Sequence, residues 1–208
     1  MTSPPSLLWN GPKHAPLTVA LAHGAGAPMD TSFMDFFAEG LGQRGYRVAR
    51  FEFPYMAKRR ESGGRRPPDR QPVLLETWQT VIAKIDDENL VIGGKSMGGR
   101  MATMMADEAG VSGLLCLGYP FYGAGRADKP RTAHLEALKT PTLICQGTRD
   151  PMGNRETVSG LKLSKCLEIH WAEDGDHDLK PRKASGRTHE QNLTGALDAA
   201  AAFLSALR

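Results

Sequence analysis

One serine in this chain stands in a sequence typical of a nucleophile. Residues 94–98 read Gly-Lys-Ser-Met-Gly, so Ser96 has a glycine two positions before it and another two positions after it. An apolar run precedes this pentapeptide, and a stretch rich in Met and Ala follows it. Between a strand and a helix, such a sequence holds the serine hydroxyl in a strained turn at the edge of a sheet. The pattern indicates nucleophilic chemistry at Ser96.

A serine nucleophile also needs a base to accept its proton and a carboxylate to orient that base. His177 lies in a Gly-Asp-His sequence, and Asp150 follows an apolar run at 142–146. Taken singly, Asp150 also fits a turn before Pro151, and His177 also fits a solvated loop. The chain order Ser, Asp, His is the one used by hydrolases built on a parallel sheet. This order favours the interpretation of Asp150 as the acid and His177 as the base.

The developing oxyanion needs two backbone N–H donors near the serine. One is expected from the residue after the nucleophile, Met97, and the other from the loop after the first long strand. That loop is made of small residues after His23, and Ala25 is the favoured donor in it, with Gly26 second. We interpret His23 as a structural residue that forms hydrogen bonds within the loop.

Other motifs in the chain fail on spacing. A phosphate-binding loop that ended at Ser96 would need its first glycine where Asn89 stands, and a dinucleotide fingerprint would need its third glycine where Met29 stands. Asp174, Asp176 and His177 read as a polar loop and not as a metal site. We therefore expect no cofactor and no metal.

Apolar runs alternate with helical periodicities, which predicts the sheet that must position these groups. The near-continuous apolar runs indicate strands of a parallel sheet that helices cover on both faces. Asp30 is placed to cap the first helix, Pro72 to open the second, and Thr188 with Gln191 to form a capping box on the last. The predicted fold is a single-domain α/β fold over residues 1–208. Strands are expected at 17–22, 47–53, 90–93, 113–117, 142–146 and 167–171, and helices at 33–44, 72–85, 97–109 and 188–207.

Composition limits the class of protein. The 208 residues are 40% hydrophobic and 24% charged, as in ordinary globular domains. No apolar run reaches the roughly 20 residues of a membrane helix, and residues 1–16 lack the order of a signal peptide. The three cysteines, Cys116, Cys145 and Cys166, indicate buried free thiols in a reducing compartment. We expect a cytoplasmic protein without a membrane partner.

Positive charge is concentrated in one segment. Residues 58–70 hold six basic and two acidic side chains, and because the whole chain carries +3, the rest carries −1. The net charge of the chain outside this segment does not indicate nucleic-acid binding. We expect residues 58–72 to form a long loop, in which two roles are open for the arginines. They pair with acidic neighbours, or they bind a carboxylate or phosphate of a substrate. The candidates for the second role are Arg59, Arg60, Arg65 and Arg66.

The serine pentapeptide, Asp150, His177 and the His-Gly pair at 23–24 together resemble the α/β-hydrolase superfamily, over nearly the whole chain. Residues 59–60, 65–68, 93–100 and 175–177 are most similar to the small, dienelactone-hydrolase-like KANL3/Tex30-type α/β hydrolases. The superfamily resemblance implies hydrolysis of an ester, thioester, amide or related acyl bond. Residues 118–139 are too few for a cap domain, so we expect an open site for a small or surface-presented acyl substrate.

Two hypotheses for function follow. The first is a serine hydrolase of the carboxylesterase or acyl-hydrolase type that works through an acyl-enzyme intermediate. The second is a non-catalytic interaction module that keeps the hydrolase fold, since a fold alone does not define a function. The sequence leaves substrate identity, oligomeric state and a lid role for residues 118–139 open.

Overall fold

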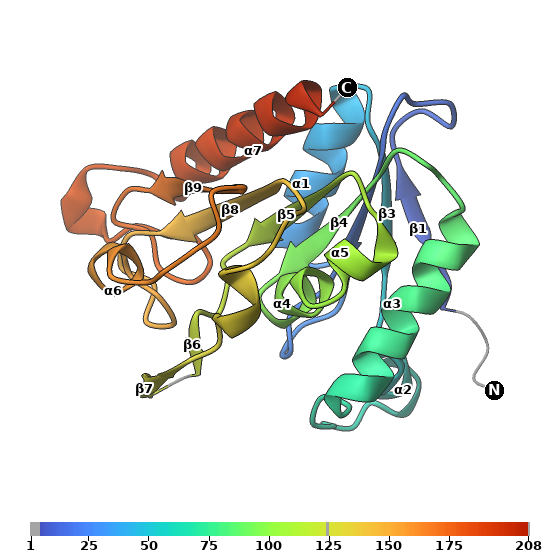
Figure 1. The fold of residues 1–208 in the computed structure, drawn as a ribbon, viewed down its shortest axis with the longest axis horizontal. Helices are drawn as coiled ribbons and strands as arrows, with labels where there is room; N and C mark the ends of the chain where they lie inside the picture. Colours follow the sequence, from blue (N-terminus) through green and yellow to red (C-terminus); the bar gives the residue numbers. More distant parts are fainter. Residues whose placement is uncertain (1–4, 124, 208) are drawn as a thin grey trace.

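Seven strands form the sheet that carries the candidate residues, in a computed structural model that describes residues 5–123 and 125–207. Their order across the sheet is β1-β3-β2-β4-β5-β8-β9, from right to left in Figure 1. The short first strand is antiparallel to β3, and all other pairs are parallel. The strands are β1 (Leu8–Asn10), β2 (Thr18–Ala22), β3 (Arg47–Phe51), β4 (Leu90–Lys95), β5 (Gly113–Leu117), β8 (Thr142–Gly147) and β9 (Leu167–Ala172).

Helices cover both faces of this sheet, as the apolar strands predict (Figure 1). Side chains of α1 (Ser32–Gln43) and α7 (His189–Ala206) pack on one face. The opposite face is covered by α2 (Pro54–Ser62), α3 (Gln71–Ile85), α4 (Met97–Thr103), α5 (Ala106–Ala109) and α6 (Arg155–Ser159). The predicted α/β fold is thus confirmed.

Alternate residues of each buried strand belong to different cores. In β2, Val19 and Leu21 face α1 and α7, whereas Ala20 and Ala22 face α3 and α4. All four are fully buried. Full burial of a Val or Leu side chain contributes roughly 1.5–3 kcal/mol. The two cores therefore fix the register of β2 and the point at which it ends.

Helix boundaries follow the expected caps with one correction. The Thr188 hydroxyl and the Gln191 side chain form the predicted capping box at the start of α7. The prediction that Asp30 caps α1 is wrong, because the hydroxyl of Thr31 accepts the Met34 N–H instead. The Asp30 carboxylate is paired with Arg60.

The expected long loop at 58–72 is partly a helix. Pro54 stands at the first position of α2, a place where its missing N–H costs nothing, and Gly63 ends the helix with φ 68°. Arg59 and Arg60 therefore lie in the last turn of α2. The sequence did not indicate this helix because its second half, residues 58–61, is charged and the segment carries little apolar periodicity. The loop itself spans residues 63–70.

Other departures are local. The helix expected at 97–109 is interrupted after Thr103 and continues as α5. Residues 118–139 hold the hairpin of β6 (Tyr122–Gly123) and β7 (Arg126–Pro130) and the 3-10 turn η1 (Ala133–Leu135), and the hairpin projects at the lower left of Figure 1. Cys116 and Cys145 are buried as expected, but Cys166 is exposed. Its position just before β9 lies outside the apolar run.

The helices of this chain were expected not to span a membrane. Within residues 5–123 and 125–207, no helix combines the length and apolarity needed to cross a bilayer. The cytoplasmic location stays a prediction.

Glycines shape the turn around Ser96, as their spacing predicts. Gly94 has φ 137°, and a Cβ there would lie 2.0 Å from the carbonyl oxygen of Ala22. A Cβ on Gly98 would lie 2.6 Å from the same oxygen. Real Cβ atoms do not approach backbone oxygens this closely, so only glycine lets β2 pass beside the turn.

This close approach predicts a large loss of stability in Gly94→Ala. Displaced backbone and an unfavourable φ together should lower the free energy of unfolding by about 3 kcal/mol or more. Gly160→Ala is the matched control, because the nearest atom to its added Cβ is 3.8 Å away, and a change within about 0.5 kcal/mol is expected. Urea unfolding of both variants measures the difference. Equal midpoints would contradict the steric argument.

Candidate active site

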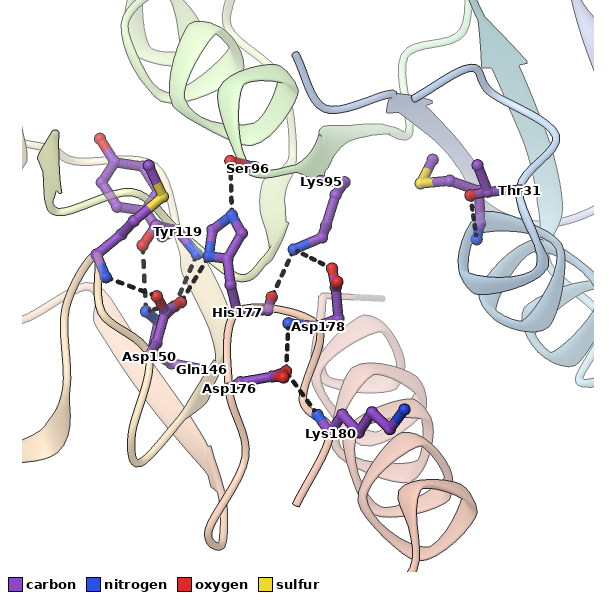
Figure 2. Close-up of polar contacts among 12 residues, drawn as sticks. Thr31, Lys95, Ser96, Tyr119, Gln146, Asp150, Asp176, His177, Asp178 and Lys180 are labelled. Carbon is purple, nitrogen blue, oxygen red and sulfur yellow. Dashed lines mark hydrogen bonds and ion pairs between the residues drawn. The ribbon is translucent and has the colours of Figure 1, made fainter. Parts of the chain in front are cut away.

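Ser96 lies directly after β4, at the carboxyl edge of the sheet. Its backbone has φ 50° and ψ −113°, a strained conformation for a residue with a side chain. Figure 2 shows its hydroxyl turned toward the His177 ring, with Oγ 2.8 Å from Nε2. On the far side of the ring, Nδ1 lies 2.7 Å from Oδ2 of Asp150. The structure thus brings the three predicted side chains into one hydrogen-bonded chain, although they come from distant parts of the sequence.

Asp150 is fully buried, and its carboxylate is held by three donors. Besides His177, the Met152 N–H donates to Oδ1 at 2.7 Å and the Gln146 amide donates to Oδ2 at 2.8 Å. Gln146 in turn accepts the Tyr119 N–H at 2.7 Å (Figure 2). These bonds satisfy a buried charge and fix its orientation toward the imidazole. Gln146 is a supporting residue that sequence reasoning missed, since a glutamine at the end of a strand carries no motif.

The loop that carries His177 is tied down on both sides of the histidine. Before it, the Asp174 carboxylate accepts the Arg182 N–H at 2.7 Å and pairs with Arg149. The bonds with Arg182 hold the pKa of Asp174 at about 2, below its usual value. The N–H groups of Asp178 and Lys180, which follow the histidine, donate to Oδ1 of Asp176 at 2.9 Å each. This bonding keeps the ring of His177 in place.

Lys95, the residue before the serine, joins the two halves of the site. Its Nζ donates to the carbonyl of His177 at 2.5 Å and pairs with Asp178 at 3.1 Å (Figure 2). Burial lowers the pKa of Lys95, while the charge of Asp178 opposes that shift. A Cβ on Gly118 would lie 2.8 Å from Nζ, so this glycine leaves room for the ammonium group. The sequence drew attention to Lys95 only within the rejected phosphate-loop motif.

The loop at 23–27, expected to supply an oxyanion donor, is held by hydrogen bonds of the His23 and Tyr55 side chains. His23 is fully buried; its Nε2 accepts the Phe53 N–H at 3.1 Å, which places the proton on Nδ1, 2.6 Å from the Gly24 carbonyl. Burial lowers the pKa of His23, in keeping with a neutral ring. The Tyr55 hydroxyl donates to the Ala25 carbonyl at 3.0 Å. His23 is therefore a structural residue, as predicted.

Two cavities meet at Ser96. The larger, about 930 Å³, is lined on one side by apolar side chains of α1 and α7, among them Phe33, Phe36 and Leu193. The smaller, about 400 Å³, lies over α4 and also contains Met97. Ala25 and Ser96 line both. The predicted oxyanion donors thus stand beside the serine, and the N–H of Met97 is free of an intrahelical partner because it opens α4.

None of the four arginines proposed from sequence is among the described residues that line these cavities. Arg60 pairs with Asp30 and Glu52, the first of the two roles considered. Arg59 donates to the Gly26 carbonyl at 3.2 Å and so supports the loop at 23–27. Arg65 and Arg66 are exposed.

Among the residues that the structure describes, no three or more His, Cys, Asp or Glu side chains are grouped to hold a metal ion.

With this geometry in view, residues 15–205 match the family model described as an alpha/beta hydrolase domain, and the chain belongs to that family. The superfamily resemblance is thereby confirmed. The narrower KANL3/Tex30-type resemblance stays a prediction.

Solved structures share the fold over most of their length. An alpha-beta serine hydrolase homologue from Coxiella burnetii aligns with TM-score 0.69 at 18% identity, covering 90% of this chain and 89% of its own. Est1E from Butyrivibrio proteoclasticus aligns with TM-score 0.70 at 13% identity, covering 96% and 94%. XC6422 from Xanthomonas campestris, described as an a/b serine hydrolase without lid, aligns with TM-score 0.62 at 15% identity, covering 94% of each chain. At these identities the likeness concerns the fold alone.

The contacts of Lys95 predict that Lys95→Met loosens the loop of His177. Hydrogen bonds to charged groups contribute about 1.5–3 kcal/mol, so amide exchange at residues 176–180 should become at least about tenfold faster. Hydrogen–deuterium exchange measures this, with Lys165→Met, an exposed lysine, as the control. Unchanged exchange in the loop would contradict the anchoring role.

The lowered pKa of Asp174 predicts that Asp174→Asn reduces the stability of the fold by an amount that depends on pH. A carboxyl with pKa 3.8 in the unfolded chain and about 2 in the folded protein stabilises the fold above pH 3.8, and this contribution is lost as pH falls toward 2. The variant should therefore melt below wild type at pH 7, and the two melting temperatures should converge between pH 4 and pH 2. Thermal unfolding followed by circular dichroism tests this. A gap that stays constant across the range would refute it.

Proposed function

We propose that this protein is a serine hydrolase that cleaves an ester, thioester or related acyl bond through an acyl-enzyme intermediate. The observation that carries the proposal is the hydrogen-bonded chain from Ser96 Oγ through His177 to Asp150, with separations of 2.8 and 2.7 Å. Nucleophile, base and orienting carboxylate within hydrogen-bond reach form the arrangement that activates a serine hydroxyl. Membership of the alpha/beta hydrolase family supports this assignment.

In the first half of the reaction, Oγ of Ser96 attacks the acyl carbon while Nε2 of His177 accepts the hydroxyl proton. The carbonyl electron pair moves onto oxygen, where the N–H groups of Ala25 and Met97 are the proposed donors. Collapse of this intermediate breaks the bond to the leaving group, which departs with the proton from His177. Asp150 keeps the imidazole in the required tautomer and stabilises its positive form.

In the second half, water takes the place of the leaving group. His177 accepts a proton from the water as its oxygen attacks the acyl carbon, and the bond to Ser96 Oγ breaks when the proton returns to that oxygen. The products are a carboxylic acid and free enzyme. Because acid, base and nucleophile are all side chains, the proposed cycle uses no cofactor.

The cavities support a small-molecule or surface-presented acyl substrate. The 930 Å³ cavity has apolar walls beside Ser96 and is large enough for a substituted acyl or alcohol group. Residues 118–139 form a hairpin and a short turn instead of a helical cap. A carboxylesterase or related acyl hydrolase fits this site.

The alternative is a non-catalytic module on the same fold. Such a module needs no Gln146 network to orient a buried carboxylate toward a histidine, so the hydrogen bonds around Asp150 favour the enzyme. The two hypotheses differ in one measurable property, the reactivity of Ser96.

A fluorophosphonate probe and a short-chain p-nitrophenyl ester test the proposal. Wild-type protein should be labelled and should hydrolyse the ester, whereas Ser96→Ala should lose labelling and at least about 10⁴-fold in kcat. Asp150→Asn should lower kcat by about 10⁴-fold because the imidazole takes the wrong tautomer. Circular dichroism checks that each variant is folded. Absence of labelling in folded wild type would favour the interaction module.

A further inference from the structure

The smaller cavity beside Ser96 holds two arginines that the reaction itself does not use. Arg100 and Arg131 both line this space of about 400 Å³, together with Ser96, Ala25 and Met97. A group bound by the arginines would thus lie next to the reacting atoms. The sequence pattern gave no weight to either residue, because they lie outside the basic segment at 58–70.

Arg100 follows Ser96 by four residues, one turn along α4, so its side chain is on the same helix face as the serine. The side chain is half-buried, and its Nε is buried without a hydrogen-bond partner among the described residues. No ion pair joins Arg100 to a carboxylate in the described part of the chain. Burial lowers the pKa of its guanidinium, and the charge of Arg131 lowers it as well. The arrangement therefore places an uncompensated cation beside the nucleophile.

Arg131 reaches the same cavity from the segment after β7. Its N–H donates to the Phe121 carbonyl at 2.7 Å, and its own carbonyl accepts the Tyr119 hydroxyl at 3.4 Å. His134, three residues on, lies 2.9 Å from the hydroxyl of Thr103 on α4. These contacts hold the backbone of Arg131 in a fixed position relative to the helix that carries Arg100.

The charges around the cavity define the kind of ligand that fits. One carboxylate, Asp69, also lines it and accepts the N–H of Tyr55 at 2.8 Å. Two guanidinium groups and this carboxylate leave a single positive charge. A singly charged carboxylate balances it, whereas a doubly charged phosphate would leave an excess of negative charge. Guanidinium groups match the planar geometry of a carboxylate through paired N–H donors.

We propose that Arg100 and Arg131 bind a carboxylate of the substrate, so that the enzyme prefers acyl esters that carry a carboxylate on one side of the scissile bond. This inference rests on the proposed hydrolase function and adds a substrate class to it. The opposite side of the bond is then directed toward the apolar wall of Phe33, Phe36 and Leu193 in the larger cavity. The substrate class is an ester or thioester with an apolar part on one side of the scissile bond and a carboxylate on the other.

Two matched pairs of esters test this preference. The mono-p-nitrophenyl ester of glutarate is compared with its methyl-capped diester, which places the carboxylate in the acyl part. 4-Acetoxybenzoate is compared with its methyl ester, which places the carboxylate in the leaving group. Wild type should show a kcat/KM at least about tenfold higher for the charged member of one pair, since hydrogen bonds to charged groups contribute about 1.5–3 kcal/mol.

Variants then assign the preference to the two arginines. Arg100→Gln and Arg131→Gln should each lower kcat/KM for the preferred charged ester by about tenfold or more, and leave the rate with its methyl ester within about twofold. Arg131→Lys keeps the charge without the paired donors and should recover only part of the loss. Lys129→Gln is the matched control, because it removes a positive charge two residues before Arg131, at an exposed position outside the cavity lining.

Three results would overturn the proposal. The first is a wild-type enzyme that shows no preference in either pair. The second is a preference that survives in both glutamine variants, and the third is a preference that disappears equally in Lys129→Gln. Turnover of the methyl esters and labelling of Ser96 by fluorophosphonate are measured in every variant. These readouts test the hydrolase function separately, so a failure of the carboxylate site is distinguishable from a failure of the proposed function.

Discussion

The contact between the end of β2 and the serine turn is the constraint on which the rest of this site depends. Gly94 and Gly98 both face the Ala22 carbonyl, at distances that exclude a Cβ. This contact brings the loop at 23–27 beside Ser96, so that Ala25 and Ser96 line the same cavities. The strained backbone of Ser96, with φ 50°, persists because packing on both sides of the sheet over-determines it.

Neighbouring parallel strands end at one edge, and the site is assembled there from four of them. β2 leads to the proposed oxyanion loop, β4 to the serine, β8 to Asp150 and β9 to His177. Each loop carries its own support: His23 and Tyr55 under the first, Gln146 beside Asp150, and Lys95 against the carbonyl of His177. In the proposed reaction, such supports would keep Ser96, His177 and Asp150 within the small tolerances that proton transfer needs.

The arginines of the basic segment at 58–70 and those of the cavity over α4 differ in how their charges are paired. In the basic segment that the sequence emphasised, Arg60 is neutralised by Asp30 and Glu52, and Arg59 supports a backbone loop. The cavity over α4 is lined by both Arg100 and Arg131, and Asp69 is the one carboxylate among its described lining residues. Local density of basic residues in a sequence is therefore a poor guide to where a cation is left available for a ligand.

The sequence by itself determined the alternation of strands and helices, the serine turn and the order of Ser96, Asp150 and His177, because apolar periodicity, glycine spacing and chain order are local properties. It did not indicate α2, because that segment carries little apolar periodicity. It also did not indicate that Thr31, and not Asp30, caps α1. Gln146, Lys95, Arg100 and Arg131 took their positions only in the tertiary structure. Their partners lie on other strands and loops, so their hydrogen bonds and charge balance depend on which strand ends meet at the edge of the sheet.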